Sequence, residues 1–141
     1  MEIVISPSIA KKLKLNENDK LIKIERVTIV RGVPLSYHLN WLPFESFSDV
    51  LHWDLNNQTL CDTLQSKYGV SPSVGEETLE STVANIREAH ILEVPANASI
   101  LLAECVTHDA DGTPYMFSKV LFRGDRIKLH FQYQKAPTVS D

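Results

Sequence analysis

Segments of alternating apolar and polar residues, together with one strongly apolar segment at residues 99–107, predict six β-strands. They are expected at residues 21–30, 35–42, 76–83, 99–107, 115–122 and 127–133. In the last of these segments, from Ile127 to Tyr133, apolar side chains occupy the odd positions and polar side chains occupy the even positions. Residues 31–34 and 109–112 have turn-forming sequences, and strands joined by such short turns pair in an antiparallel manner.

Capping signals predict three short helices in addition to the strands. The first starts at Ser6, which is followed by proline at the first helical position. Asn57 can cap a second helix that ends at Gly69, and a third starts at Asn85, which forms a capping box with Glu88. An antiparallel sheet with separate short helices belongs to the α+β class, in which the helices pack on one side or end of the sheet.

Length and composition fit one globular domain of 141 residues. The 14 basic and 18 acidic residues give a net charge of −4, and an acidic surface disfavours direct binding to nucleic acid. No apolar run approaches the roughly 20 residues that span a bilayer, so no membrane association is expected. Cys61 and Cys105 lack CxxC spacing, and we expect them to be reduced thiols in a cytoplasmic protein.

The sequence lacks the residue patterns of a metal or cofactor site. Its five histidines are not spaced as metal ligands, and Asp109-x-Asp111-Gly112 lacks the closing glutamate of a calcium loop. No phosphate-binding loop or dinucleotide fingerprint occurs, so no cofactor is expected. Cys61 has no obvious neighbouring base, which makes packing in the core the default role of this cysteine.

The strand at residues 21–30 carries the most informative residue, an arginine between apolar neighbours. Ile24, Arg26 and Thr28 share one face of this strand. The stem of Arg26 could cover apolar surface while its charged head reaches water. Alternatively, the guanidinium could line a pocket and bind a carboxylate or phosphate through two parallel hydrogen bonds. The residues alone leave both interpretations open.

The length of the hairpin loop decides which residues lie opposite Arg26. A three-residue loop at 32–34 would place Thr28 opposite His38. The same register would place Arg26 opposite Asn40, so that the polar side chains form one cluster. A two-residue loop would instead turn apolar and aromatic residues of the second strand toward that face, because a shift of one residue exchanges the two faces of a strand.

An ordered set of short motifs resembles a known domain family. The motifs are Leu13-x-Leu15, Ile24-Glu25-Arg26-Val27, Pro34-x-x-Tyr37, Leu42-Pro43, Thr59-Leu60-x-x-x-Leu64, Tyr68-Gly69-Val70, Asp111-Gly112-x-Pro114, Ser118 and Phe122-Arg123-Gly124-Asp125-Arg126. From about residue 9 to residue 131, the chain is similar to the UTRA domain. This domain is the effector-binding half of transcription regulators of the GntR family, HutC subfamily.

The resemblance implies an antiparallel sheet with flanking helices, similar to the fold of chorismate lyase. It also implies a homodimer and a pocket for a small-molecule effector, within an effector-binding and dimerisation domain at residues 1–134. Residues 135–141 are expected to form a disordered tail. In the family a winged helix-turn-helix domain comes first. The segment before Leu13 is too short to form one, so DNA would be bound through a domain that this chain lacks.

Eight residues become ligand-binding candidates when the resemblance is applied position by position. They are Arg26, Thr28, His38, Thr59, Cys61, Met116, Ser118 and Phe122. Relatives that bind phosphorylated sugars tend to have an arginine where Arg26 stands and a second arginine where Thr28 stands. His38 and Met116 occupy positions that are usually acidic in the family, so acceptors for sugar hydroxyls are missing. The resemblance therefore implies a small organic anion with an apolar or aromatic body as the effector.

Two other functions stay open at this point. A lyase similar to chorismate lyase is compatible with an arginine in a pocket for a dicarboxylate, although the sequence offers no clear general acid. A dimerisation module with a degenerate pocket agrees with the missing acidic residues. We expect a regulator domain rather than an enzyme.

Overall fold

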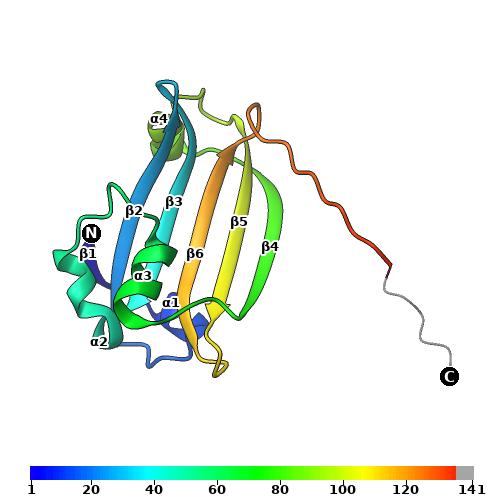
Figure 1. The fold of residues 1–141 in the computed structure, drawn as a ribbon. Helices are drawn as coiled ribbons and strands as arrows, with labels where there is room; N and C mark the ends of the chain where they lie inside the picture. Colours follow the sequence, from blue (N-terminus) through cyan, green and yellow to red (C-terminus); the bar gives the residue numbers. More distant parts are fainter. Residues whose placement is uncertain (136–141) are drawn as a thin grey trace, which may run out of the picture.

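The described part of the chain, residues 1–135, folds around a six-stranded antiparallel sheet in a computed structural model (Figure 1). The strands are β1 (Glu2–Ile5), β2 (Lys20–Val30), β3 (Val33–Pro43), β4 (Val74–Val83), β5 (Ser99–His108) and β6 (Pro114–Arg123). Their order across the sheet is β1-β2-β3-β6-β5-β4, so β1 and β4 form the two edges. The predicted α+β class is confirmed, and five of the six predicted strands are present.

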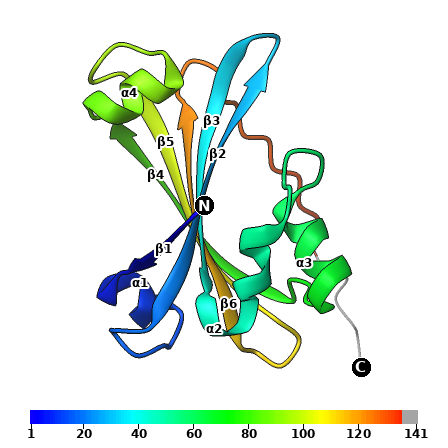
Figure 2. The ribbon, with the colours of Figure 1, turned by 90° about the vertical axis from the view of Figure 1, so that its left-hand side faces the viewer.

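Short helices cover parts of both faces of the sheet. They are α1 (Pro7–Lys12), α2 (Phe44–Phe47), the 3-10 helix η1 (Ser48–His52), α3 (Leu60–Tyr68) and α4 (Ile86–Leu92). Figure 2 shows α1 and α4 on one side of the sheet and α2 and α3 on the other. None of these helices is long and apolar enough to cross a bilayer.

Apolar contacts anchor α3 to one face of the sheet, which we call the α3 face. Ile24 of β2, Leu42 of β3 and Met116 of β6 contribute to this cluster. Leu60 and Leu64 of α3 pack against it and are 6% and 0% exposed. Separate apolar clusters lie on the opposite face, beneath α1 and α4. The anchored α3 holds the residues of its first turn over the β2–β3 hairpin.

The β2–β3 hairpin turns through two residues, Arg31 and Gly32, so the two-residue alternative for the loop is the one that forms. Both turn residues have positive φ angles, 51° for Arg31 and 77° for Gly32. Turns of this kind match the right-handed twist of paired strands and are the usual two-residue hairpin connection. Without any further irregularity, this turn would place Tyr37 opposite Arg26.

A β-bulge returns the polar residues to one face. The pairing shifts next to Thr28, so that Thr28 lies opposite Ser36 and Arg26 lies opposite His38. The polar cluster that was expected only for a three-residue loop therefore forms with a two-residue loop, and its register differs by two residues from the one that the longer loop would give. Tyr37 packs beneath α4 on the opposite face.

The starts of two helices agree with the capping predictions, and the third differs. α1 begins after Ser6, and α4 begins after Asn85 with a complete capping box. The cap of α3 is Thr59 and not Asn57, because the Thr59 hydroxyl accepts a hydrogen bond from the backbone N–H of Asp62 at 3.1 Å. β1, α2 and η1 were not predicted, since segments of four or five residues are too short to display a clear period.

The predicted strand at residues 127–133 is wrong. Beyond β6, residues 124–126 form a turn and residues 127–135 have no regular structure. Figure 1 shows this segment running away from the sheet. Its sequence has the alternation of a strand, but a strand needs a partner, and residues 127–135 pair with none among residues 1–135. The predicted disordered tail lies outside the described residues, apart from Lys135.

Candidate functional site

A cavity of about 320 Å³ lies between the β2–β3 hairpin and the first turn of α3. Nine residues line it: Arg26, Val27, Thr28, His38, Asn40, Thr59, Leu60, Cys61 and Met116. Six of the eight predicted ligand-binding residues are among them. The hairpin, α3 and β6 are distant in sequence, and the β-bulge and the apolar anchoring of α3 bring these side chains together.

Arg26 is half-buried and holds the loop that leads into α3. Its Nη2 donates to the backbone carbonyl oxygens of Leu55, at 2.7 Å, and Gln58, at 3.3 Å. Among residues 1–135, Nε and Nη1 of Arg26 donate no hydrogen bond, and no carboxylate lies within 4.0 Å of the guanidinium. A guanidinium has five N–H donors, so most of them remain for a ligand in the cavity.

His38 lies beside Arg26, in surroundings that disfavour its protonated form. Its Nε2 is 2.8 Å from the hydroxyl of Ser36 and 3.1 Å from the hydroxyl of Thr28. Burial lowers the pKa of His38 below its usual value, and the nearby charge of Arg26 lowers this pKa further. Both effects act against the protonated imidazole.

Ser118 and Phe122 do not line the cavity. The hydroxyl of Ser118 donates to Oδ1 of Asn40 at 2.8 Å, so Ser118 orients a residue that does line it. Phe122 is paired with Ser36, beyond His38 on the same strands, and lies outside the reach of α3. The sequence signal for Asn40 was its place on the polar face of the hairpin.

Cys61 opens onto the cavity from α3 and does not pack in the core, contrary to the prediction. Although the residue is exposed as a whole, partial burial of its thiol raises the pKa, and the carboxylate of Asp62 raises it further. The protonated thiol is a weak nucleophile. Cys105 is also a free cysteine. Among residues 1–135 there is no group of three or more side chains that could hold a metal ion.

Comparison with known proteins decides the family. The sequence model of the UTRA domain family matches residues 2–128 of this chain. The chain belongs to the UTRA domain family. In GntR-family regulators, the general role of this domain is to bind an effector and to couple it to DNA binding by an N-terminal domain.

One curated relative is the HTH-type transcriptional repressor NagR of Bacillus subtilis (strain 168), which is 28% identical over 104 residues. The match covers 74% of this UTRA domain but 42% of NagR, so the chain spans less than half of the length of that relative.

Solved structures share the fold. The effector domain of PhnF from Mycobacterium smegmatis has a TM-score of 0.89 at 20% identity, with 95% of this chain and 83% of that chain covered. The C-terminal domain of the histidine utilization repressor from Pseudomonas syringae pv. tomato str. DC3000 has a TM-score of 0.86 at 19% identity, with 95% and 94% covered. The C-terminal domain of Yurk from Bacillus subtilis gives 0.87 at 18% identity, with 93% and 90% covered.

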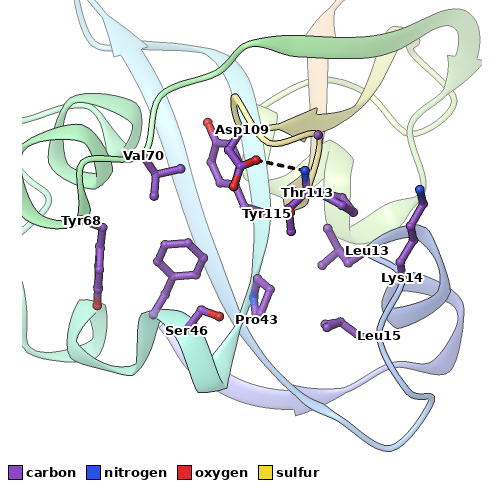
Figure 3. A pocket seen from close by; sticks show the side chains of 13 residues that line it. Leu13, Lys14, Leu15, Pro43, Ser46, Tyr68, Val70, Asp109, Thr113 and Tyr115 are labelled. Atoms are coloured by element: carbon purple, nitrogen blue, oxygen red, sulfur yellow. Dashed lines mark hydrogen bonds between the residues drawn. The ribbon is translucent and has the colours of Figure 1, made fainter.

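A second, larger cavity of about 560 Å³ lies near the other end of the UTRA domain (Figure 3). Its walls are largely apolar, with Leu13, Pro43 and Tyr115 among the lining residues. Asp109 also lines it, but one carboxylate oxygen of Asp109 already accepts from the backbone N–H groups of Asp111 and Thr113, at 2.9 and 3.0 Å. The larger cavity is also lined by Lys14 and by Tyr68, whose buried hydroxyl has no hydrogen-bond partner among the described residues. The cavity beside Arg26 differs in being lined by a half-buried guanidinium and by six of the eight predicted residues, and it is the candidate pursued below.

The assignment of Thr59 as helix cap predicts a difference in stability between two nearby variants. Thr59→Ala should lower the free energy of unfolding by about 1 kcal/mol, because the backbone N–H of Asp62 loses its acceptor. Asn57→Ala should change it by less than about 0.5 kcal/mol, as for most exposed positions. Urea denaturation followed by circular dichroism measures both, and a larger loss in Asn57→Ala would contradict the assignment.

Proposed function

We propose that this UTRA domain binds a small organic anion in the cavity beside Arg26. The domain would act as the effector-sensing part of a cytoplasmic, homodimeric regulator of the GntR family, HutC subfamily, in which a separate N-terminal domain binds DNA. The observation that carries the proposal is the half-buried guanidinium of Arg26, which faces the cavity with no carboxylate beside it among the described residues.

The guanidinium of Arg26 offers an anion a positive charge and N–H donors in a fixed arrangement. Carbonyl oxygens of Leu55 and Gln58 accept from the guanidinium but do not neutralise it. A charged group that is partly removed from water is stabilised by an opposite charge that also satisfies its hydrogen bonds. Hydrogen bonds between ionised partners are worth about 1.5–3 kcal/mol, and a carboxylate or phosphate can accept two from one guanidinium.

The rest of the lining favours a compact anion with an apolar body. Because Oδ1 of Asn40 accepts from Ser118, the amide nitrogen of Asn40 remains as a donor. Leu60 and Met116 add apolar surface, and no acidic side chain lines the cavity. The hydroxyls of a sugar donate as well as accept, and no acidic acceptor for them lines the cavity, whereas a carboxylate only accepts and carries the charge opposite to that of Arg26. A volume of about 320 Å³ is at the lower end of the usual range for ligand pockets.

Binding of a ligand to Arg26 can change the conformation of the loop before α3, because the same guanidinium binds that loop. Each pair of parallel hydrogen bonds that a guanidinium can form with one anion includes Nη2, so an anion bound in this way competes with the carbonyl oxygens of Leu55 and Gln58, which lie in the loop before α3. A ligand shifts a conformational equilibrium only by its difference in affinity between the two states. The loop bound to Arg26 and the loop released from Arg26 would be two such states. We propose that the change between them alters the position of the DNA-binding domain.

The titratable side chains of the cavity, His38 and Cys61, are better suited to binding a ligand than to catalysis. The pKa of His38 is lowered and the pKa of the Cys61 thiol is raised, so neither group is prepared to act as a general acid or a thiolate nucleophile at neutral pH. The relatives described above are transcription regulators. We therefore propose a function without enzymatic turnover, and release of pyruvate from chorismate by the purified protein would contradict it.

A thermal-shift screen should find the ligand class. Aromatic and short-chain carboxylates should raise the melting temperature, whereas neutral sugars should not. A ligand at 100 times its Kd raises the free energy of unfolding by about 2.7 kcal/mol, which is several degrees for a domain of this size. Arg26→Met should lose the shift. Arg31→Asn, which removes an arginine from the hairpin turn but not from the cavity, should keep it.

Two results of this screen would count against the proposal. An unchanged shift in Arg26→Met would show that the guanidinium does not bind the anion. Stabilisation by sugar phosphates but not by carboxylates would exclude the proposed ligand class.

Affinity for the anion should fall as the pH rises. In the free domain the charge of Arg26 helps to lower the pKa of His38, and an anion beside Arg26 offsets this charge and raises that pKa. Binding then takes up a proton, so affinity is greatest at low pH and decreases through the histidine range. Calorimetric titration between about pH 5.5 and 8, with the tightest carboxylate from the screen, measures this dependence. His38→Gln should flatten it, and a rise in affinity with pH would contradict the role of His38.

A further inference from the structure

The larger cavity, of about 560 Å³, lies at the opposite end of α3 from the cavity beside Arg26. Tyr68, the last residue of α3, and Val70 line the larger cavity, whereas Thr59 and Cys61 at the start of α3 line the smaller one. The larger volume is within the range of about 300–1,000 Å³ that is usual for small-molecule sites. The two cavities share no lining residue, so they are separate spaces.

Four segments form the walls of the larger cavity, and backbone hydrogen bonds fix their conformation. The lining residues come from segments 13–15, 43–47, 68–70 and 109–115. In the first segment, the backbone N–H of Leu15 donates to the carbonyl oxygen of Ala10 at 2.9 Å. In the last segment, the backbone N–H of Asp109 donates to the carbonyl oxygen of Thr113 at 3.0 Å and closes the β5–β6 turn. A ligand would therefore enter a site whose walls are already formed, which lowers the entropic cost of binding.

Most of the lining of the larger cavity is apolar, and three aromatic rings are part of it. Phe47 and Tyr115 are 5% and 4% exposed. The ring of Phe47 meets that of Tyr68 edge to face, with 4.9 Å between the centroids, and lies 6.3 Å from that of Tyr115. Figure 3 shows the buried Leu13 across the cavity from Tyr68. These side chains favour a ligand with an apolar or aromatic body, because such a body leaves water when it binds.

Two charged side chains of opposite sign, Asp109 and Lys14, also line the larger cavity. Oδ1 of Asp109 accepts from the backbone N–H groups of Asp111 and Thr113, whereas Oδ2 accepts no hydrogen bond within residues 1–135. In that part of the chain neither Asp109 nor Lys14 forms a salt bridge, so the two are not paired with each other. In the view of Figure 3 they lie on either side of Thr113.

This balance of charges distinguishes the larger cavity from the one beside Arg26. A carboxylate and an ammonium that are separate from each other match a molecule that itself carries both charges. A simple anion would be repelled by the carboxylate of Asp109, and a simple cation would be repelled by Lys14. A zwitterion offers each of the two side chains an opposite charge and leaves the net charge of the site unchanged.

We propose that the larger cavity binds a free α-amino acid with an apolar or aromatic side chain. Oδ2 of Asp109 accepts from the ammonium of the ligand, and Lys14 pairs with the carboxylate of the ligand. The side chain of the ligand lies against Phe47, Tyr115 and Leu13. This site does not rest on the proposed function, because it shares no residue with the cavity beside Arg26.

Calorimetric titration of the Arg26→Met variant tests the site. The substitution removes the guanidinium of the smaller cavity, so that the carboxylate of an amino acid has no partner there, and it leaves the lining of the larger cavity unchanged. Phenylalanine and leucine should bind saturably, and phenylalanine should bind equally well to the unmodified chain. Glycine, which lacks an apolar body, and N-acetylphenylalanine, which lacks the ammonium, should bind about tenfold more weakly or less.

Two substitutions in the β5–β6 turn separate the charge of Asp109 from its structural role. Asp109→Asn keeps Oδ1 as the acceptor for the turn but replaces Oδ2 by an amide donor, so the affinity for phenylalanine should fall about tenfold or more. Asp111→Asn makes the same change at an exposed residue that does not line the cavity, and it should change this affinity less than about twofold. Both variants should keep the circular dichroism spectrum of the unmodified chain.

Three results would each overturn the proposal. They are no binding of phenylalanine or leucine to the Arg26→Met variant, equal affinity of that variant for phenylalanine and N-acetylphenylalanine, and an equal loss of affinity in Asp109→Asn and Asp111→Asn. None of these results bears on the proposed function, which is tested by the carboxylate-dependent thermal shift and its loss in Arg26→Met. Absence of that shift in the unmodified chain, with phenylalanine still bound, would reject the anion site alone.

Discussion

The site depends on how the guanidinium of Arg26 is placed between a loop and a cavity. The carbonyl oxygens of Leu55 and Gln58 fix one terminal nitrogen, and the remaining donors have no partner among the described residues. A cation in this position is held by dipoles rather than by an opposite charge. The proposed anion would therefore bind the same guanidinium that fixes the loop leading into α3.

The cavity lies where the apolar contact between α3 and the sheet ends. Ile24 is buried beneath α3, and two residues further along the same strand Arg26 faces the cavity. Leu60 and Leu64 fix the helix, and Thr59 at its first turn both caps the helix and lines the cavity. Packing of α3 and the composition of the cavity are thus parts of the same arrangement, and a change that loosened α3 would also disturb the site.

Much of the fold and most of the site could be predicted from local patterns. Alternation and, for β5, a strongly apolar run located the five strands from β2 to β6, and their tight turns implied antiparallel pairing. The polar face of the hairpin was expected only for the three-residue loop, one of two alternatives that the sequence left open. A two-residue turn followed by a bulge at Thr28 leaves the same side chains on that face. A bulge depends on the twist and pairing of the whole hairpin, so its place could not be fixed in advance, although Pro34, which has no backbone N–H for the strand ladder, favours such an irregularity beside it.

The remaining differences between the sequence predictions and the structure also depend on tertiary contacts, which local sequence patterns do not show. Asn57 and Thr59 are both suitable caps, and tertiary packing decides where α3 begins, because Leu60 must reach the core. Phe122 shares the face of the site but lies beyond the reach of α3, a distance that sequence alone does not reveal. Residues 127–133 have the alternation of a strand, but within residues 1–135 they join no sheet, and a pattern of side chains does not show whether a strand is available for pairing.

Nuclear magnetic resonance of the arginine side chains tests the central claim most directly. Titration of the domain with benzoate, as a simple aromatic carboxylate, should shift the Nε–H resonance of Arg26 saturably and slow its exchange with water, because the anion accepts from this guanidinium. The resonance of Arg31 in the hairpin turn should stay unchanged. An unaltered Arg26 resonance, with chemical shift changes confined to the second cavity, would contradict the account.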